Sequence, residues 1–346
     1  MNTLPRIALA LGIGAAGGGI FYVLGLPLPW MLGALFATMA ASVANAPILG
    51  PSRLRPAVVA VIGVLLGSSF TPAIIAEASA WTGTVAILLV YVIAVALVVV
   101  PFYRFAGKFD WVTAYFAGMP GGLSEMIEIG EASGAKPAPI ILAHSLRIVI
   151  TIALIAFWFR IVEGHDVGAS TVRAEMPLTG IDGLLLLGSA VIGSVIGQKL
   201  KFPAPTFLGP LLVSAILHLA GTTESAPPGL LVNIAQVLLG TVLGCRFLGI
   251  SPSTLIPAAV LALGATTLSL GLALLAGLSM GHLAGISLDQ ALLALAPGGL
   301  TEMGLIALAI HADVAFVALH HVMRILFVIV LAPLTFRLLL SRRLPP

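Results

Sequence analysis

The chain has 346 residues, of which 60% are hydrophobic and only 8% are charged, and its formal net charge is +3. A soluble domain carries about 25% charged residues because its surface faces water, so this composition excludes a soluble fold and predicts an integral membrane protein. The sequence contains no long basic run and no zinc-binding pattern, which argues against a nucleic-acid partner.

Apolar segments long enough to cross a bilayer recur along the whole chain. About 20 residues of helix cross roughly 30 Å of hydrocarbon. The first half has such segments at residues 6–24, 28–45, 56–76, 82–103 and 138–160. The second half has them at residues 181–198, 204–221, 230–249, 254–278 and 314–338. We therefore predict transmembrane helices at these positions, five in each half.

An internal repeat relates the two halves. Residues 120–126 read Pro-Gly-Gly-Leu-Ser-Glu-Met, and residues 297–303, 177 positions later, read Pro-Gly-Gly-Leu-Thr-Glu-Met. The same offset relates two His-x-x-Arg pairs, and an offset of 176 relates two Pro-x-Pro segments at 27–29 and 203–205. Several landmarks in one order indicate a tandem duplication. We predict a first repeat at residues 1–162, a linker at 163–180 and a second repeat at 181–346.

Each repeat also contains an apolar segment that is interrupted, at residues 110–133 and 287–311. Asp110 and Ser287 are suitable helix N-cap residues at the start of these segments. About ten residues separate each cap from Pro-Gly-Gly, and ten helical residues rise about 15 Å, half the hydrocarbon thickness. Each segment therefore either re-enters and leaves on one face of the membrane, or crosses as a discontinuous helix.

The placement of lysine and arginine favours re-entrant segments, because cytoplasmic loops are enriched in these residues. Re-entry gives ten spans with both termini inside, and the following basic residues then fall inside: Arg53, Arg55, Arg104, Lys108, Lys136, Lys199, Lys201, Arg342 and Arg343. An odd number of spans in each repeat gives the repeats opposite orientations. The predicted fold is an all-α polytopic membrane protein of two inverted repeats, each with five transmembrane helices plus a re-entrant or broken-helix hairpin.

The Pro-Gly-Gly breaks are the first candidate binding elements. Proline and glycine end regular helix, and backbone freed at membrane depth costs several kcal/mol per group unless a partner satisfies it. Such breaks line substrate sites in many transporters, although packing against side chains is the alternative. The candidate residues are Pro120, Gly121, Gly122, Ser124 and Glu125 in the first repeat, and Pro297, Gly298, Gly299, Thr301 and Glu302 in the second.

Buried charges accompany the breaks. Glu125 and Glu302 are either proton carriers or cation ligands, or carboxylates that only offset the helix dipole. The His-x-x-Arg pairs lie about ten residues inside apolar spans: His144 with Arg147, and His321 with Arg324. They provide either an anion-binding guanidinium with a proton-exchanging histidine, or ion pairs of Arg147 with Glu125 and of Arg324 with Glu302.

The twin Pro-Gly-Gly-Leu-[Ser/Thr]-Glu-Met segments, the His-x-x-Arg pairs and the sequence Pro-Leu-Pro-Trp-Met-Leu-Gly at 27–33 resemble the AbrB membrane-protein family over nearly the whole chain. Proteins of this bacterial family are often labelled regulators of gene expression and sometimes ammonia monooxygenases. The resemblance implies a multi-pass protein of the bacterial inner membrane. It supplies no established site residues.

These observations favour a secondary transporter that moves a small anion with a coupled proton or cation. The alternative is a membrane-embedded sensor that affects gene expression indirectly. An enzyme is not expected, because the histidines and Cys245 form no spaced metal-ligand set. The expected partners are the lipid bilayer and a small solute or ion, without a cofactor, a metal or direct nucleic-acid contact, and homo-oligomerisation is left open.

Overall fold

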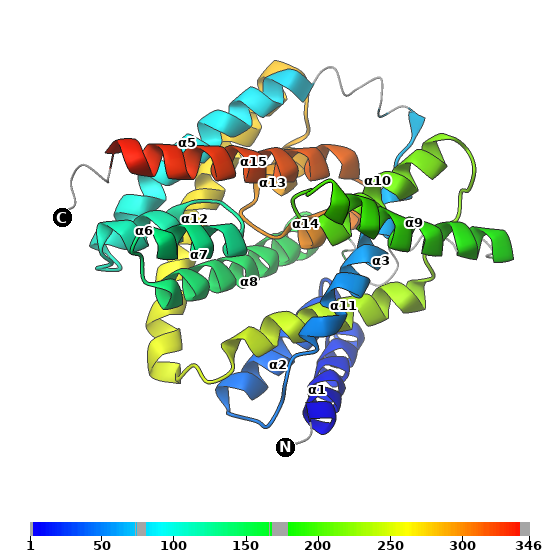
Figure 1. Ribbon diagram of the computed structural model, residues 1–346, viewed down its shortest axis with the longest axis horizontal. Helices are drawn as coiled ribbons and strands as arrows, with labels where there is room; N and C mark the ends of the chain where they lie inside the picture. The colour runs from blue at the N-terminus through cyan, green and yellow to red at the C-terminus, as the bar shows by residue number, and fades with distance from the viewer. Residues whose placement is uncertain (1–2, 73, 75–80, 166, 168–178, 340–346) are drawn as a thin grey trace. The chain divides into compact units, whose positions relative to one another are not determined.

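The computed structural model describes residues 3–72, 74, 81–165, 167 and 179–339 (Figure 1). Most of the predicted linker, part of the predicted span at 56–76, and Arg342 and Arg343 therefore lie outside the described residues. The described residues form helices and no strand. Seven helices are long and apolar enough to cross a membrane: Thr3–Val23, Thr82–Phe105, Pro137–Ile161, Gly180–Lys199, Gly229–Phe247, Pro252–Ala284 and Val314–Leu338. The chain is a multi-pass helical membrane protein, as its composition predicts.

Three of the ten predicted spans form shorter helices within the described residues. They are Pro29–Val43, Arg55–Gly67 and Pro205–Leu219. The last has 15 residues, so it rises about 22 Å, which is less than the hydrocarbon thickness. Proline explains two of the three starts, because it has no N–H to lose in the first helical turn. Pro29 and Pro205 each follow a residue with positive φ that turns the chain into the helix.

The chain divides into two compact units, and each takes elements from both predicted repeats. Unit 1 comprises Met1–Ala76, Ala153–Pro252 and Gly304–Val314. Unit 2 comprises Glu77–Ile152, Ser253–Met303 and Ala315–Pro346. Unit 1 thus contains the first three spans of each repeat. Unit 2 contains the fourth span of each repeat, most of the two hairpins, and the adjoining parts of the fifth spans.

The helices of unit 1 pack through glycines that recur at the repeat offset. Its helices are α1 (Thr3–Val23), α2 (Ala34–Val43), α3 (Arg55–Gly67), α9 (Gly180–Lys199), α10 (Pro205–Leu219) and α11 (Gly229–Gly244). A Cβ atom on Gly33 would collide with the backbone of Gly17, and one on Gly209 would collide with Gly193, 176 residues later in each case. Small residues at such crossings let helix backbones approach closely.

The repeats also exchange contacts inside unit 1. Gly63 of α3 lies against α10, where a Cβ atom would be 2.6 Å from the Phe207 carbonyl oxygen. Gly240 of α11 lies in the same way against the Met31 carbonyl oxygen, one residue before α2 in the adjoining π-helical turn Pro29–Gly33. The second helix of each repeat therefore packs on the third helix of the other. Neither repeat forms its share of unit 1 without its counterpart.

The backbone carries the duplication independently of side chains. Residues with positive φ recur at an offset of 176 or 177, and all but one of these pairs include a residue that favours this region, glycine or asparagine. The pairs are Gly25 with Lys201, Leu28 with Ala204, Asn45 with Gly221, Lys108 with Gly285, and Gly134 with His311. The turns of the two repeats therefore share one conformation although most of their residue types differ.

Unit 2 contains the two hairpins. Its elements are α5 (Thr82–Phe105), α6 (Trp111–Gly118), α7 (Leu123–Ala132), α8 (Pro137–Ile161), α12 (Pro252–Ala284), α13 (Leu288–Leu295), α14 (Leu300–Ala309) and α15 (Val314–Leu339), of which α8, α12, α14 and α15 continue into unit 1. The predicted N-caps are confirmed. Asp110 accepts from the Thr113 amide and Ser287 accepts from the Gln290 amide, at the first turns of α6 and α13.

The first hairpin folds back on itself. The Lys136 amide, just beyond α7, donates to Thr113 Oγ1 in the first turn of α6 at 3.0 Å. Gly130 of α7 lies against the ring of Phe116 of α6, and the two arms run side by side (Figure 1). A helix that continued across the membrane would separate Thr113 from Lys136 by about 30 Å. The first segment is therefore a hairpin that returns to the level where it began.

The glycine crossings of unit 1 give a stability prediction. Gly33→Val and Gly209→Val should each lower the free energy of unfolding by about 1–3 kcal/mol, because the added atoms force packed backbones apart. Gly188→Val on α9 is the matched control, since a Cβ atom there meets nothing within 4 Å. Thermal unfolding of the purified protein in detergent would measure all three. Equal losses in all three variants would contradict the close-packing explanation.

Candidate functional site

Two buried arginines hold the backbone at the two Pro-Gly-Gly breaks. Arg147 of α8 donates from Nη1 to the Met119 carbonyl at 3.0 Å and from Nη2 to the Gly121 carbonyl at 3.1 Å. Arg324 of α15 donates to the equivalent carbonyls of Ala296 and Gly298. These carbonyls follow the last turn of α6 and α13, where no intrahelical donor remains. Each guanidinium also places its charge at the negative end of a short helix.

The histidines of the two pairs bind the same helix ends one turn earlier. His144 Nε2 lies 2.9 Å from the Phe116 carbonyl oxygen, and His321 Nε2 lies 2.9 Å from the Leu293 carbonyl oxygen. A carbonyl only accepts, so Nε2 carries the proton in both rings. Arg324 Nη2 donates to Nδ1 of His321 at 3.1 Å, so that nitrogen has no proton. His321 is therefore neutral, and proton exchange there first requires that this bond break.

The conserved spacing within the two seven-residue motifs has a direct steric explanation. A Cβ atom on Gly121 would lie 3.2 Å from the side chain of Met126, and one on Gly298 would lie 3.0 Å from Met303 Cε. The motif methionine therefore packs on the first glycine of its own motif. Gly121 also lies against Val328 of α15, which closes the first break from the other side. The breaks are filled by side chains at these points, as the packing alternative predicts.

The motif glutamates fold back over the second glycine. The carboxylate of Glu125 lies against Gly122, and that of Glu302 lies against Gly299. Each glycine precedes the arm whose first turn contains the glutamate, so each carboxylate lies at the positive end of α7 or α14. The local dipole interpretation is thus supported by position. It does not exclude proton binding, because a carboxylate at this place can still be protonated.

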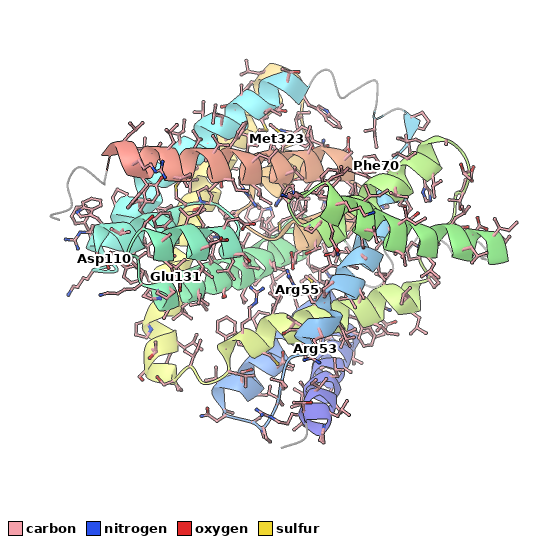
Figure 2. All side chains as sticks on the ribbon, in the orientation of Figure 1. Arg53, Arg55, Phe70, Asp110, Glu131 and Met323 are labelled. Carbon is pink, nitrogen blue, oxygen red and sulfur yellow. The ribbon has the colours of Figure 1, made fainter. Side chains whose placement is uncertain are left out.

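The two hairpins differ in exposure. Ser124 is exposed and Glu125 is half-buried on α7, whereas Glu302 is only 6% exposed. The Thr301 hydroxyl donates to Glu302 at 2.7 Å. The surface of α7 also carries Glu131, which with Asp110 marks the outer end of the first hairpin (Figure 2). The second hairpin is therefore the more enclosed of the two.

The structure does not contain the ion pairs considered from the sequence. Among the described residues neither Arg147 nor Arg324 has a carboxylate within ion-pair distance, and their partners are backbone carbonyls instead. The reason is geometric. Each arginine holds the end of the first arm, whereas each glutamate lies over the start of the second arm. The side chains of opposite charge are thus placed on opposite sides of the break.

Tyrosines that sequence reasoning missed surround the arginines. Tyr91 of α5 is 2% exposed, and its hydroxyl lies 3.5 Å from the Ser269 carbonyl oxygen of α12. Tyr91 is near enough to interact electrostatically with both arginines, which also repel one another. Both guanidinium Nε atoms are buried without a hydrogen-bond partner among the described residues. The repeat could not have indicated Tyr91, because its counterpart is Leu268.

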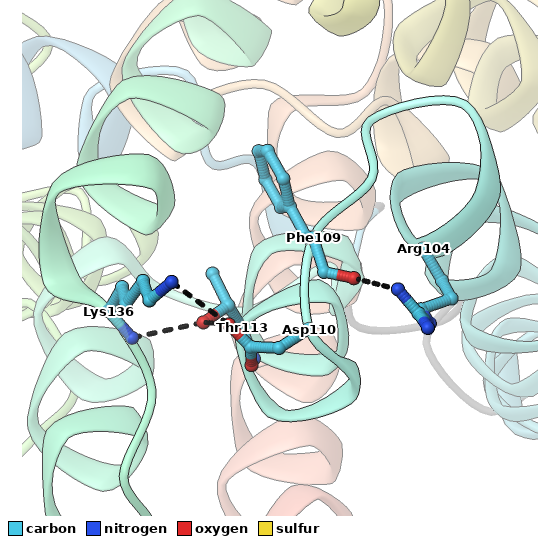
Figure 3. A network of polar contacts seen from close by, with 5 residues as sticks. All are labelled: Arg104, Phe109, Asp110, Thr113 and Lys136. Carbon is cyan, nitrogen blue, oxygen red and sulfur yellow. Dashed lines mark hydrogen bonds and ion pairs between the residues drawn. The ribbon is translucent and has the colours of Figure 1, made fainter.

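A polar network joins the outer ends of the first hairpin (Figure 3). The Thr113 hydroxyl donates to Asp110 Oδ2 at 2.8 Å, and Lys136 Nζ lies 4.0 Å from the same oxygen. Arg104 of α5 donates to the Phe109 carbonyl at 2.8 Å and lies over the Trp111 ring. The network fixes where the hairpin starts and ends, at the end opposite to the break.

No metal site is present in the part of the chain that the structure describes, where no three His, Cys, Asp or Glu side chains could together hold an ion. His320, next to His321, points elsewhere. Its Nδ1 bonds the Phe316 carbonyl and its Nε2 bonds the Thr84 hydroxyl of α5. Chelation by the adjacent histidines is therefore absent.

Comparison with known proteins supports one family. The family model described as "Transition state regulatory protein AbrB" matches residues 30–340. The chain belongs to the AbrB family. It is 28% identical to "Uncharacterized protein YhjN" of Bacillus subtilis (strain 168), over 95% of this chain and 92% of that protein. It is 25% identical to "Putative regulator AbrB" of Escherichia coli (strain K12), over 94% of this chain and 92% of that protein.

The arginine contacts give the first prediction for this AbrB-family site. Arg324→Gln should lower the free energy of unfolding by about 1–3 kcal/mol, because buried carbonyls lose a charged donor. Arg324→Lys should not restore it, since an ammonium cannot replace a planar fork that bonds several carbonyls. Arg53→Gln, at an exposed position of unit 1, is the control. Full recovery with lysine in thermal unfolding would contradict the role of the fork.

The hairpin network gives a second prediction. Asp110→Ala should cost about 1 kcal/mol of stability, the usual contribution of an N-cap, with Glu128→Ala on the exposed face of α7 as control. Burial by itself raises the pKa of Asp110, but hydrogen bonds from Thr113 and the Lys136 charge outweigh it and lower the pKa below its ordinary value.

The stability due to Asp110 is therefore complete above the ordinary carboxyl pKa and is lost as pH falls through the lowered one. Unfolding midpoints of the wild type and Asp110→Ala should accordingly converge in acid. A difference that persists unchanged at low pH would show that the carboxylate charge is not involved.

Proposed function

We propose that this protein is a secondary transporter that moves a small anion together with a proton, with its binding site in unit 2. The observation that carries the proposal is the pair of buried guanidinium groups, each at a break in a hairpin and each without a carboxylate partner among the described residues. A buried charge without a counter-ion costs several kcal/mol. An anion on the free Nε edges of Arg147 and Arg324 would remove that cost.

The charges around each break suggest how a proton would be coupled. With the glutamate ionised, arginine and glutamate balance one another although they do not touch. When the glutamate is protonated, the guanidinium charge is left uncompensated and attracts an anion. Proton binding and anion binding then favour each other, which is the linkage that a symporter needs. Glu302 is the stronger candidate, because it is buried and Glu125 is half-exposed.

The duplicated architecture supports movement of a solute rather than binding only. Hairpins interrupted at membrane depth, one in each repeat, are typical of carriers built from inverted repeats. We propose that the repeats have opposite orientations in a bacterial inner membrane, with both termini cytoplasmic. The returning path of the first hairpin supports an odd number of crossings in the first repeat. We assign no catalytic residue, and the proposal involves no enzyme activity and no cofactor.

A second candidate function is a membrane sensor that affects gene expression indirectly. The names of the family model and of the Escherichia coli relative favour it, since both refer to regulation. A sensor would bind the same anion at the same arginines without moving it. Binding and flux must therefore be measured separately.

The test uses the purified full-length protein. Thermal-shift assays with sodium formate, acetate, pyruvate, chloride and nitrate at one ionic strength should show stabilisation by at least one anion, larger at pH 6 than at pH 8. Arg147→Gln should abolish the shift. Glu302→Gln, which imitates the protonated acid, should keep the shift and remove its pH dependence. Absence of any arginine-dependent shift would contradict the assignment of an anion.

The anion that binds would then be supplied in labelled form to proteoliposomes under a pH gradient. Uptake that collapses with the gradient and is absent in Arg147→Gln supports the transporter. Binding without uptake in properly oriented liposomes supports the sensor.

A further inference from the structure

A histidine of unit 1 lies at the end of α10, far along the chain from the arginine pairs. His218 is in the last turn of that helix. Its Nδ1 is 2.8 Å from the carbonyl oxygen of Ser214, one turn earlier, and its Nε2 is 3.0 Å from the carbonyl oxygen of Ser225, in the loop that leads to α11. Both ring nitrogens thus contact backbone carbonyl oxygens.

A count of protons decides the charge of this ring. A carbonyl oxygen only accepts, so Nδ1 and Nε2 must both donate. The Ser214 hydroxyl cannot supply a proton to Nδ1, because it already donates to the Val64 carbonyl of α3 at 2.9 Å. A neutral imidazole has one N–H only. It would leave a nitrogen lone pair facing an oxygen lone pair at about hydrogen-bond distance. The geometry is therefore that of an imidazolium.

The surroundings favour the charged ring. His218 lies at the C-terminal end of α10, where the helix dipole favours a positive charge. The nearest charged groups are acidic: Glu224 in the same loop, and Asp182 of α9, which accepts from the Thr223 hydroxyl at 2.8 Å. Thr223 Oγ1 in turn accepts from the Ser225 amide. The element α3 contributes a carbonyl at this place, and no item of charge on it contacts the ring among the described residues.

We infer that His218 is a proton-binding site whose bound proton fastens the 223–225 loop between α9 and α10. Asp182 holds this loop through Thr223, and His218 holds it through the Ser225 carbonyl. Loss of the proton removes one of the two attachments, so that the loop and the end of α10 separate. The inference needs neither the anion nor the transport proposed above, because its ligand is the proton and its residues belong to unit 1.

Only the second repeat contains this arrangement. The counterpart of His218 in the first repeat is Ser42, whose hydroxyl donates to the Thr38 and Gly244 carbonyls. A serine has no charge to gain, so the first repeat keeps the same helix end fastened at any pH. The proton therefore acts on one end of the duplicated structure. If the repeats have opposite orientations, it acts from one side of the membrane.

Nitrogen NMR of the full-length protein tests the inference directly. Protein labelled with ¹⁵N-histidine in detergent would be titrated from pH 8 to pH 5, with resonances assigned by His218→Gln and by His282→Gln. His282 is the matched control, an exposed histidine in the last turn of α12. At the pH where half of His282 has lost its proton, both nitrogens of His218 should still give imidazolium shifts. A neutral His218 at that pH would overturn the inference.

Hydrogen exchange of the 220–228 backbone provides the structural readout. In the wild type, the loop amides should exchange slowly in acid and faster once His218 loses its proton. His218→Gln should exchange fast at every pH after correction for intrinsic rates, and His282→Gln should behave as the wild type. Exchange that does not change as His218 titrates would overturn the fastening role, and neither result depends on any anion measurement.

Discussion

The structure of unit 2 depends on the hydrogen bonds between two buried guanidinium groups and the carbonyls at two helix breaks. A helix that stops in an apolar environment leaves carbonyls without donors, and each costs several kcal/mol if it stays unsatisfied. Arg147 and Arg324 supply those donors from the following helix. One interaction thus satisfies the backbone, fixes each hairpin to its neighbouring span and brings positive charge to the interior.

The steric details of the Pro-Gly-Gly motif follow from this constraint. Once the arginine fixes the end of the first arm, the chain must turn at once to start the second. Methionine then packs on the first glycine and glutamate on the second. A side chain on either glycine would occupy the place of its own motif partner. The carboxylate consequently lies on the far side of the break from the guanidinium, and this separation of charge is what makes a ligand site plausible physically.

The duplication serves two different purposes in the two units. In unit 1 the repeats exchange helices through glycine crossings, so that small side chains and close backbones define the packing. In unit 2 the repeats contribute equivalent breaks and arginines but different surroundings. Tyr91 and Glu128 have leucine counterparts, and His218 in unit 1 has a serine counterpart. Equivalent backbones thus carry the common architecture, while the unequal side chains provide direction and sensitivity to protons.

The sequence by itself determined the membrane class, the positions of most helices, the N-caps Asp110 and Ser287 and the repeat. These depend on composition, local hydrogen bonding and spacing, all of which are local or periodic properties of a chain. Only the tertiary structure decided that Arg147 and Arg324 bond carbonyls rather than Glu125 and Glu302, that Tyr91 lies beside them, and that each unit combines both repeats. The partner of a buried charge is set by which groups packing brings within about 3 Å, and no spacing along the chain contains that distance.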